Sequence, residues 1–366
     1  MWSGLGKTAK RVGEMEFLRF IFSIIIIFHH SRNFIGNETA LFLNGSFAVE
    51  FFFILSGFLM MKSVGKMSEQ PGNLGAETFS FIKKKYLSLY PDVIISWIIG
   101  AVATIVIGQL SLMAIATLVR DGVWEMSLLT MTGLRLETIN DALWYLSSML
   151  LAMAILFPLL RKYKNTAKLV IIPLITVLIF GYFAAEHSSI RSPFDWLGFT
   201  YRGNLRAIAD MGVGIIACQI TEVFQTKKLT VFFKTLLTGV KYVGIVGLVM
   251  YMYFIRDAAR LPYDMFCIVA IAVVIGLIFS GQTYGERLFN NGVVGFLGKF
   301  SLPLYLSHYY WADLMKLLMP NAGKTEITVV YFLLSFASAA AVMALSALIK
   351  KYKPFSKIKP LFFKSV

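Results

Sequence analysis

The sequence places an arginine and a histidine at a spacing that could serve one reaction. Arg19 and His30 lie eleven residues apart in the apolar run EFLRFIFSIIIIFHHS. At 100° and 1.5 Å per residue, eleven helical residues make three turns and about 20°, so both side chains share one face about 16 Å apart, while His29 points about 100° away. A guanidinium binds anions and an imidazole transfers protons. The first run therefore predicts a helix with one polar face, which carries a cation near one end and an imidazole near the other.

A carboxylate in the next apolar run could act together with His30. Glu50 lies about five residues inside the stretch SFAVEFFFILSGFLM, which follows the first run after a short connector. Two helices joined in this way are expected to be antiparallel neighbours, with Glu50 about as deep in the membrane as His30. Because a nearby carboxylate favours the protonated imidazole, we expect Glu50 to approach and tune this ring. The alternative is an interhelical hydrogen bond without a part in chemistry.

Basic residues gather at the Arg19 end of the predicted helix pair. Lys62 follows the second run, and Lys83, Lys84 and Lys85 stand together in FIKKKYLSLYP. Such a group could hold a phosphorylated ligand through charge-assisted hydrogen bonds. Lysines that flank a membrane span or face anionic lipids explain the same pattern.

The composition requires a membrane to hold these side chains. Of 366 residues, 57% are hydrophobic and 15% are charged, whereas a soluble domain averages about 45–50% apolar and about 25% charged residues. The sequence predicts an all-α polytopic membrane protein of about ten transmembrane helices, at residues 15–34, 46–61, 91–110, 142–160, 169–184, 205–221, 237–255, 265–280, 300–318 and 328–349. Residues 111–134 could hold an interfacial or re-entrant helix.

The distribution of Lys and Arg predicts the orientation of these spans. Alternate segments are basic, from Lys7, Lys10 and Arg11 at the start to the tail 350–366, whereas the segments between them carry one or two cations each. Cytoplasmic segments are enriched in Lys and Arg, so we expect both termini in the cytoplasm. The net charge of +15 then reflects orientation and contact with the lipid bilayer rather than nucleic-acid binding. No metal-ligand spacing is present, and we expect no metal.

Five blocks in order resemble the acyltransferase-3 family of bacterial integral-membrane O-acyltransferases, from near Glu16 to near His308. EFLR...FHH is similar to the family's first-helix pattern of an acidic residue, an Arg, ten residues and a His, and this resemblance selects His30. VEFFFILSGF is similar to its second-helix pattern, with Glu50 in place of the usual Asp. The remaining blocks are ALWYLSSMLLAM, YRGNLRAIADMGVG and LGKFSLPLYLSH.

The resemblance implies transfer of an acetyl or other acyl group from acetyl-CoA to a hydroxyl of a cell-envelope carbohydrate or glycan. The protein would then lie in the bacterial cytoplasmic membrane. His30 would be the general base and Glu50 would orient it. In a second version of this mechanism, His30 itself carries the acyl group in a relay across the membrane.

The donor site and the acceptor site follow from the same resemblance. Arg19, Lys62, Lys84 and Lys85 would bind the phosphates of acetyl-CoA. The family often has Arg-x-x-Arg before the Tyr-Pro that opens the third span, but Lys85 and Ser88 stand at these positions and lack its bidentate geometry. The acceptor candidates are Trp144, Arg206 and His308. Their alternatives are a membrane-belt aromatic, a cap on a helix pair and a buried structural histidine.

Two other functions remain open at this stage. A secondary transporter of a small carbohydrate or organic acid would also have about ten spans with charged side chains on some helix faces. We see no inverted repeat, however, which is a common sign of transporters. A non-catalytic lipid-binding protein is the third possibility, but it leaves Arg19 and His30 unexplained. With the family resemblance, we expect one membrane-embedded acyltransferase domain, residues 1–366, with spans between about 15 and 349 and a basic cytoplasmic tail at 350–366.

Overall fold

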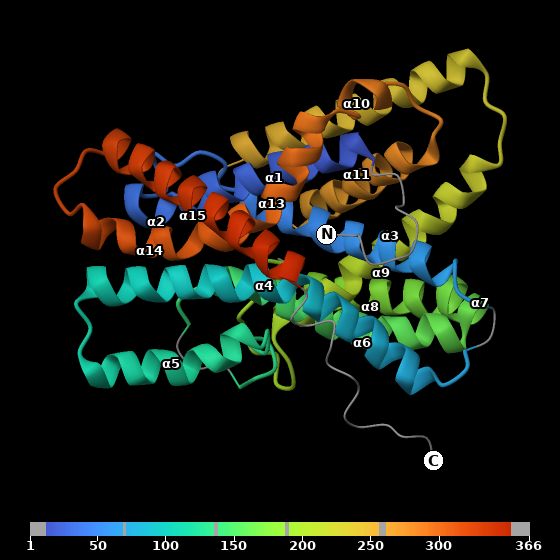
Figure 1. Cartoon of the computed structure of the whole chain (residues 1–366). Coiled ribbons are helices and arrows are strands. Elements are labelled where there is room, and N and C mark those ends of the chain that lie inside the picture. The colour runs from blue at the N-terminus through green and yellow to red at the C-terminus, as the bar shows by residue number, and fades with distance from the viewer. Residues whose placement is uncertain (1–11, 69–70, 135–137, 187–189, 256–260, 353–366) are drawn as a thin grey trace.

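The computed structural model describes residues 12–68, 71–134, 138–186, 190–255 and 261–352, and these ranges are mostly helical (Figure 1). The longer helices are α1 (Gly13–His30), α3 (Ala48–Val64), α4 (Leu74–Gly108), α5 (Leu112–Met126), α6 (Trp144–Lys162), α8 (Ile172–Glu186), α9 (Arg202–Gln225), α10 (Val231–Phe254), α11 (Leu261–Ser280), α13 (Gly292–Ser307), α14 (Tyr309–Leu318) and α15 (Lys324–Tyr352). Shorter elements join them, namely α2 (Arg32–Ile35), η1 (Gly45–Phe47), η2 (Asp141–Leu143), α7 (Lys164–Thr166), η3 (Ala167–Ile171) and α12 (Glu286–Phe289).

Eight helical segments in the described part of the chain are long and apolar enough to cross a bilayer. The predicted helical polytopic membrane fold is therefore confirmed. The two further predicted spans correspond to α1, which has 18 residues and carries Glu14, Glu16 and Arg19, and to α13, which has 16 residues. The count of ten and the cytoplasmic location of both termini stay predictions. Residues 353–366, most of the basic tail, lie outside the described residues.

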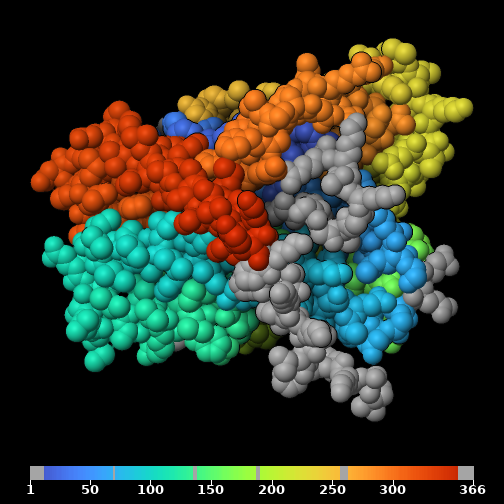
Figure 2. Space-filling view, in the orientation of Figure 1, coloured from blue at the N-terminus to red at the C-terminus, as the bar shows by residue number. Residues whose placement is uncertain are grey.

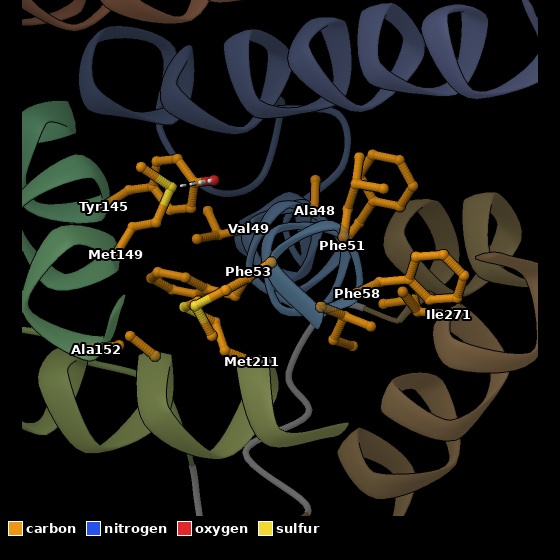
Figure 3. Close-up of a cluster of buried hydrophobic side chains, with 14 of the residues drawn as sticks. Ala48, Val49, Phe51, Phe53, Phe58, Tyr145, Met149, Ala152, Met211 and Ile271 are labelled. Carbon is orange, nitrogen blue, oxygen red and sulfur yellow. Dashed lines mark hydrogen bonds between the residues drawn. The ribbon is translucent and has the colours of Figure 1, made fainter. Parts of the chain in front are cut away.

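Helix α3 is enclosed by other helices and holds Glu50 in the interior. Figure 3 shows α3 end-on, with side chains of α6, α9 and α11 packed around it. The backbones of α3 and α9 are in direct contact, because a Cβ at Gly57 would collide with the backbone of Met211 and a Cβ at Gly214 with that of Ile54. Small residues allow this close approach of membrane helices.

Helix α1 packs along α13, and the Ser23 hydroxyl donates to the Ser301 carbonyl at 3.2 Å. The predicted span 300–318 is not one helix, because α13 ends at Ser307 and α14 begins at Tyr309. Side chains replace the helical donors at this break. The Leu306 carbonyl, for example, accepts from Ser96 Oγ at 2.8 Å and from Asn140 Nδ2 at 2.7 Å. The carbonyls that a helix end leaves without helical donors are satisfied in this way.

Helix α4 begins at Leu74, well before the predicted start of the third span at Pro91. Asn73 Oδ1 accepts from the Ala76 N–H and caps the helix. The early part of α4 packs on α6, where Phe81 stacks on Phe157 at a centroid distance of 4.2 Å. The cap and this packing extend the helix through Pro91, a residue that favours a helix start but that membrane helices also accept in their interior.

The segment 111–134 forms α5, which lies beside α4 and runs in the opposite direction (Figure 1). The Trp97 indole N–H donates to the Glu125 carboxylate at 2.8 Å and fixes the two helices to each other. Helix α5 is not among the eight candidate spans. On the face seen in Figure 2, α4 lies next to α14 and α15, and α5 lies on the other side of α4.

Candidate functional site

A cavity of about 410 Å³ lies at the C-terminal end of α1, and we name it the histidine cavity. Its lining includes His29, His30, Trp144, Arg206 and Tyr309. These side chains come from α1, α6, α9 and α14, four helices that are far apart in the sequence. Three of the predicted site residues, His30, Trp144 and Arg206, therefore open on one space.

His30 lies among other aromatic rings. Its ring centre is 5.1 Å from those of His29 and His308 and 5.0 Å from that of Tyr309. His29 is 2% exposed, and its Nδ1 lies 3.1 Å from the Phe42 carbonyl oxygen. His30 is less buried and forms no hydrogen bond with another described residue. The geometry thus favours His30 over His29 as the reactive ring.

Glu50 forms an ion pair with Arg206, which takes the place of the expected contact with His30. Both side chains are buried, at 0% and 2% exposure. The pair follows from the close contact of α3 and α9, which sets the two residues opposite each other. The Arg206 guanidinium lies 5.4 Å above the Trp144 ring. The carboxylate that was expected to orient a histidine therefore holds an arginine against the wall of the histidine cavity.

Arg191 is a lining residue of the histidine cavity that the sequence analysis did not single out. Its guanidinium lies 3.6 Å from the Asp264 carboxylate, which also accepts from the Tyr251 hydroxyl at 2.9 Å. Arg191 lies in the connection between α8 and α9, outside any apolar block. The only sequence signal was that it is one of the few cations in a weakly basic segment.

The middle cavity, of about 80 Å³, has Arg19 in its wall. Its lining includes Phe52, Lys85, Tyr145 and Tyr305, and Tyr305 also lines the histidine cavity. The rings of Phe52, Tyr145 and Tyr305 lie 5.8–6.4 Å apart between their centres. We name these three rings the aromatic barrier, because they line the middle cavity together with Arg19 and one of them, Tyr305, also faces the cavity of His30.

A third cavity, of about 870 Å³, lies at the other end of this series, and we name it the basic cavity. Lys84, Lys85, Ser88 and Arg161 line it, and Lys85 and Ser88 also line the middle cavity. Arg161 was not predicted. Its guanidinium donates to Glu77 Oε2 and to the Ser68 carbonyl, both at 2.7 Å, so it closes the wall of the cavity while Glu77 balances its charge.

Three predicted site residues lie outside these three walls: Glu50, which pairs with Arg206, and also Lys62 and His308. Lys62 is one turn beyond Phe58 on the face of α3 that packs against α11, and its ammonium lies 4.8 Å above the Phe279 ring. His308 is fully buried behind His30, at the break between α13 and α14. The structure therefore places Lys62 outside the cavity that Lys84 and Lys85 line, and it places His308 against the His30 ring rather than in the cavity wall.

The three cavities form a series through shared lining residues, Lys85 and Ser88 first and Tyr305 second. An elongated anionic substrate could place its charged end at the lysines and its reactive end at His30. Among the described residues, no group of three or more His, Cys, Asp or Glu side chains could hold a metal ion.

Comparisons with known proteins point to one family. Neither a search of curated proteins nor a search of solved structures found a match. A family model described as an acyltransferase domain matches residues 12–350, which include the residues of all three cavities. The chain therefore belongs to the acyltransferase-3 family and is an integral-membrane acyltransferase.

Proposed function

We propose that this acyltransferase moves an acetyl group from acetyl-CoA to a hydroxyl of a cell-envelope carbohydrate, in the bacterial cytoplasmic membrane. The observation that carries the proposal is the series of cavities that leads from Lys84 and Lys85, past Arg19, to His30. CoA combines a polyanionic end with a long, uncharged arm that ends in the thioester. This distribution of charge matches the series of cavities, which has lysines at one end and His30 at the other.

The donor would lie along the three cavities. Its phosphates would meet Lys84 and Lys85 in the basic cavity, with Arg19 at the entrance to the narrower part. The middle cavity, at about 80 Å³, is much smaller than its neighbours. The arm can pass only when rings of the aromatic barrier turn aside, so donor binding would itself open the route to His30.

The transfer step needs one base and one proton carrier, and His30 can be both. The imidazole takes the proton of the acceptor hydroxyl while that oxygen attacks the thioester carbonyl. The new C–O bond forms, the C–S bond breaks, and the CoA thiolate receives the proton from His30. Holding both substrates in one cavity removes much of the entropic cost of their meeting.

The acceptor would occupy the histidine cavity. Trp144, Tyr309 and Arg206 give it aromatic faces and a fixed cation, and Asp141 adds a carboxylate acceptor. Sugars present both C–H faces, which pack on aromatic rings, and hydroxyls, which bond to charged groups. This lining supports a carbohydrate acceptor.

The test uses purified protein in liposomes with acetyl-CoA labelled in its acetyl group. We expect acceptor-dependent thiol release, and His30→Ala should lower the rate by about 10²–10⁴, the usual contribution of a general base. His29→Ala should retain transfer. The opposite pattern, in which His30→Ala is active and His29→Ala is not, would overturn the assignment.

Three further measurements sharpen this test. An acetyl-histidine trapped after mixing the protein with donor alone would replace direct transfer by the relay. Solute flux down a gradient without thiol release would contradict the enzyme and support a transporter. Comparison of O-acetyl groups on envelope glycans, with and without the gene, identifies the acceptor.

A further inference from the structure

The break between α13 and α14 holds a histidine with only one of its ring nitrogens bonded. His308 is fully buried, and its Nδ1 lies 2.6 Å from the carbonyl oxygen of Tyr305. A carbonyl oxygen can only accept, so Nδ1 carries the hydrogen and donates it. In the neutral ring, Nε2 is then a bare acceptor.

His308 Nε2 has no partner in the described structure, although it is buried. A buried polar atom without a hydrogen bond is costly, and such atoms in native proteins call for an explanation. A cap on the Tyr305 carbonyl alone would need one donor, which smaller side chains supply. Ser96 and Asn140 already do this for the adjacent carbonyl of Leu306. The second nitrogen therefore points to a further role.

The surrounding rings identify the donor that Nε2 could accept from. The ring centre of His308 lies 5.1 Å from that of His30, 5.6 Å from Tyr305 and 6.2 Å from Tyr309. The Tyr305 hydroxyl donates to the Ala142 carbonyl at 2.7 Å, and the Tyr309 hydroxyl donates to Asp141 at 3.4 Å. His30 is the nearest of the three rings, and the one without a hydrogen bond to a described residue.

We propose that His308 is a positioning residue that fixes the tautomer of His30. The His30 N–H that faces His308 is donated to Nε2, which leaves the other nitrogen of His30 as a bare base toward the histidine cavity. The bond that a histidine makes with one nitrogen determines which form the other nitrogen takes. Catalytic hydrogen bonds that are long in the free enzyme often shorten when substrate binds. His308 thus takes the orienting role that Glu50 was expected to have.

The proposal rests on the proposed function, in which His30 is the base, and two substitutions test it. His308→Gln keeps an amide N–H for the Tyr305 carbonyl and an oxygen for the His30 N–H. His308→Phe keeps a ring and removes both. We expect His308→Phe to lower kcat roughly 10- to 100-fold, the size of effect that loss of a histidine's hydrogen-bond partner can have. The KM for acetyl-CoA should be unchanged, and His308→Gln should recover most of kcat.

A second readout does not depend on the substrates. Diethyl pyrocarbonate acylates the bare nitrogen of a neutral histidine, and mass spectrometry measures its reaction with His30. We expect slower modification of His30 in His308→Phe than in wild type and His308→Gln. If the wild type transfers no acyl group, the proposed function fails, and this measurement still decides the role of His308.

Ser96→Ala is the matched control for a purely structural role. It removes a hydrogen bond to the Leu306 carbonyl at the same helix end, and Ser96 does not line the histidine cavity. We expect a lower thermal stability with unchanged kcat and unchanged His30 modification. If His308→Phe behaves like Ser96→Ala, or if His308→Gln and His308→Phe lose kcat equally, His308 is only a cap and the proposal is overturned.

Discussion

The ion pair between Glu50 and Arg206 places two opposite charges in the interior of the helix bundle. Removing one partner leaves the other charge buried without its ion-pair partner, and breaking a buried pair typically costs about 3–5 kcal/mol. We expect Glu50→Gln to lower the free energy of unfolding by this amount, measured by chemical unfolding in detergent micelles. Arg206→Gln should have a similar effect.

The double variant distinguishes this pair from a Glu50 that acts on His30. Glu50→Gln with Arg206→Gln leaves no unpaired charge from the pair, so the combined loss of stability should be much smaller than the sum of the single losses. Additive losses, together with a fall in kcat for Glu50→Gln alone, would show that Glu50 acts independently of Arg206.

Lys85 and Lys62 give a second contrast between single residues. Lys85 lines both the basic cavity and the middle cavity, whereas Lys62 lies over the Phe279 ring. A hydrogen bond to a charged group contributes about 1.5–3 kcal/mol. Lys85→Gln should therefore raise the KM for acetyl-CoA roughly 10- to 100-fold, while Lys62→Gln leaves it near the wild-type value. Initial rates at varied acetyl-CoA concentration give the KM of both variants. If the two substitutions change this KM equally, the phosphates of acetyl-CoA do not bind at Lys85.

These residues also show what the sequence could predict. Residue type and helical spacing predicted that Arg19 and His30 share one helix face, and an ionisable group in an apolar run is costly enough to need an explanation. Lys85 was predicted only as one of a group of basic residues at the Arg19 end of the helix pair. Partners could not be predicted in the same way. The partner of Glu50 is on α9, more than 150 residues away in the sequence. The partner of Arg161 is Glu77, which belongs to α4 only because this helix begins at Leu74, well before Pro91.

At the scale of elements, the contact between α3 and α9 determines the geometry of the site. Gly57 and Gly214 bring the two backbones together, and a Cβ at Gly214 would collide with the Ile54 carbonyl. Overpacking of this kind costs about 1–3 kcal/mol. We expect Gly214→Ala to lower the melting temperature and to reduce acyl transfer together, because Arg206 moves with α9.

Gly247→Ala is the matched control for this prediction. Gly247 lies within α10, and a Cβ there would meet nothing within 4 Å. Alanine favours a helix over glycine by about 0.5–1 kcal/mol. Thermal unfolding in detergent should show an unchanged or higher melting temperature. If both glycine variants behaved alike, close backbone contact would not explain Gly214.

The boundaries of the helices are harder to predict from the sequence than the existence of the helices. The apolar blocks predicted the polytopic fold, since length and composition are local properties. The start of α4 at Leu74 depends on the Asn73 cap and on packing against α6, and the break at His308 depends on donors from α4 and from the residue before η2. These contacts join distant segments and leave no local pattern.

At the scale of the whole molecule, the proposed reaction depends on which side of the membrane the basic cavity faces, because CoA is cytoplasmic. Helices α3 and α9 are parallel, since Glu50 near the start of α3 meets Arg206 near the start of α9, and Gly57 meets Met211 farther along both helices. Lys228, just after α9, is therefore on the same side as Lys84. Glu38, before α3, is on the opposite side.

Cysteine labelling in intact cells measures this orientation. Cys218 and Cys267 are buried, so an impermeant maleimide should react weakly with the wild type. Glu38 and Lys228 are both exposed. We expect Glu38→Cys to be labelled in intact cells and Lys228→Cys to be labelled only after permeabilisation, because the Lys228 segment belongs to the basic, cytoplasmic set. The reverse pattern would turn the basic cavity away from the cytoplasm and deprive acetyl-CoA of its route to His30.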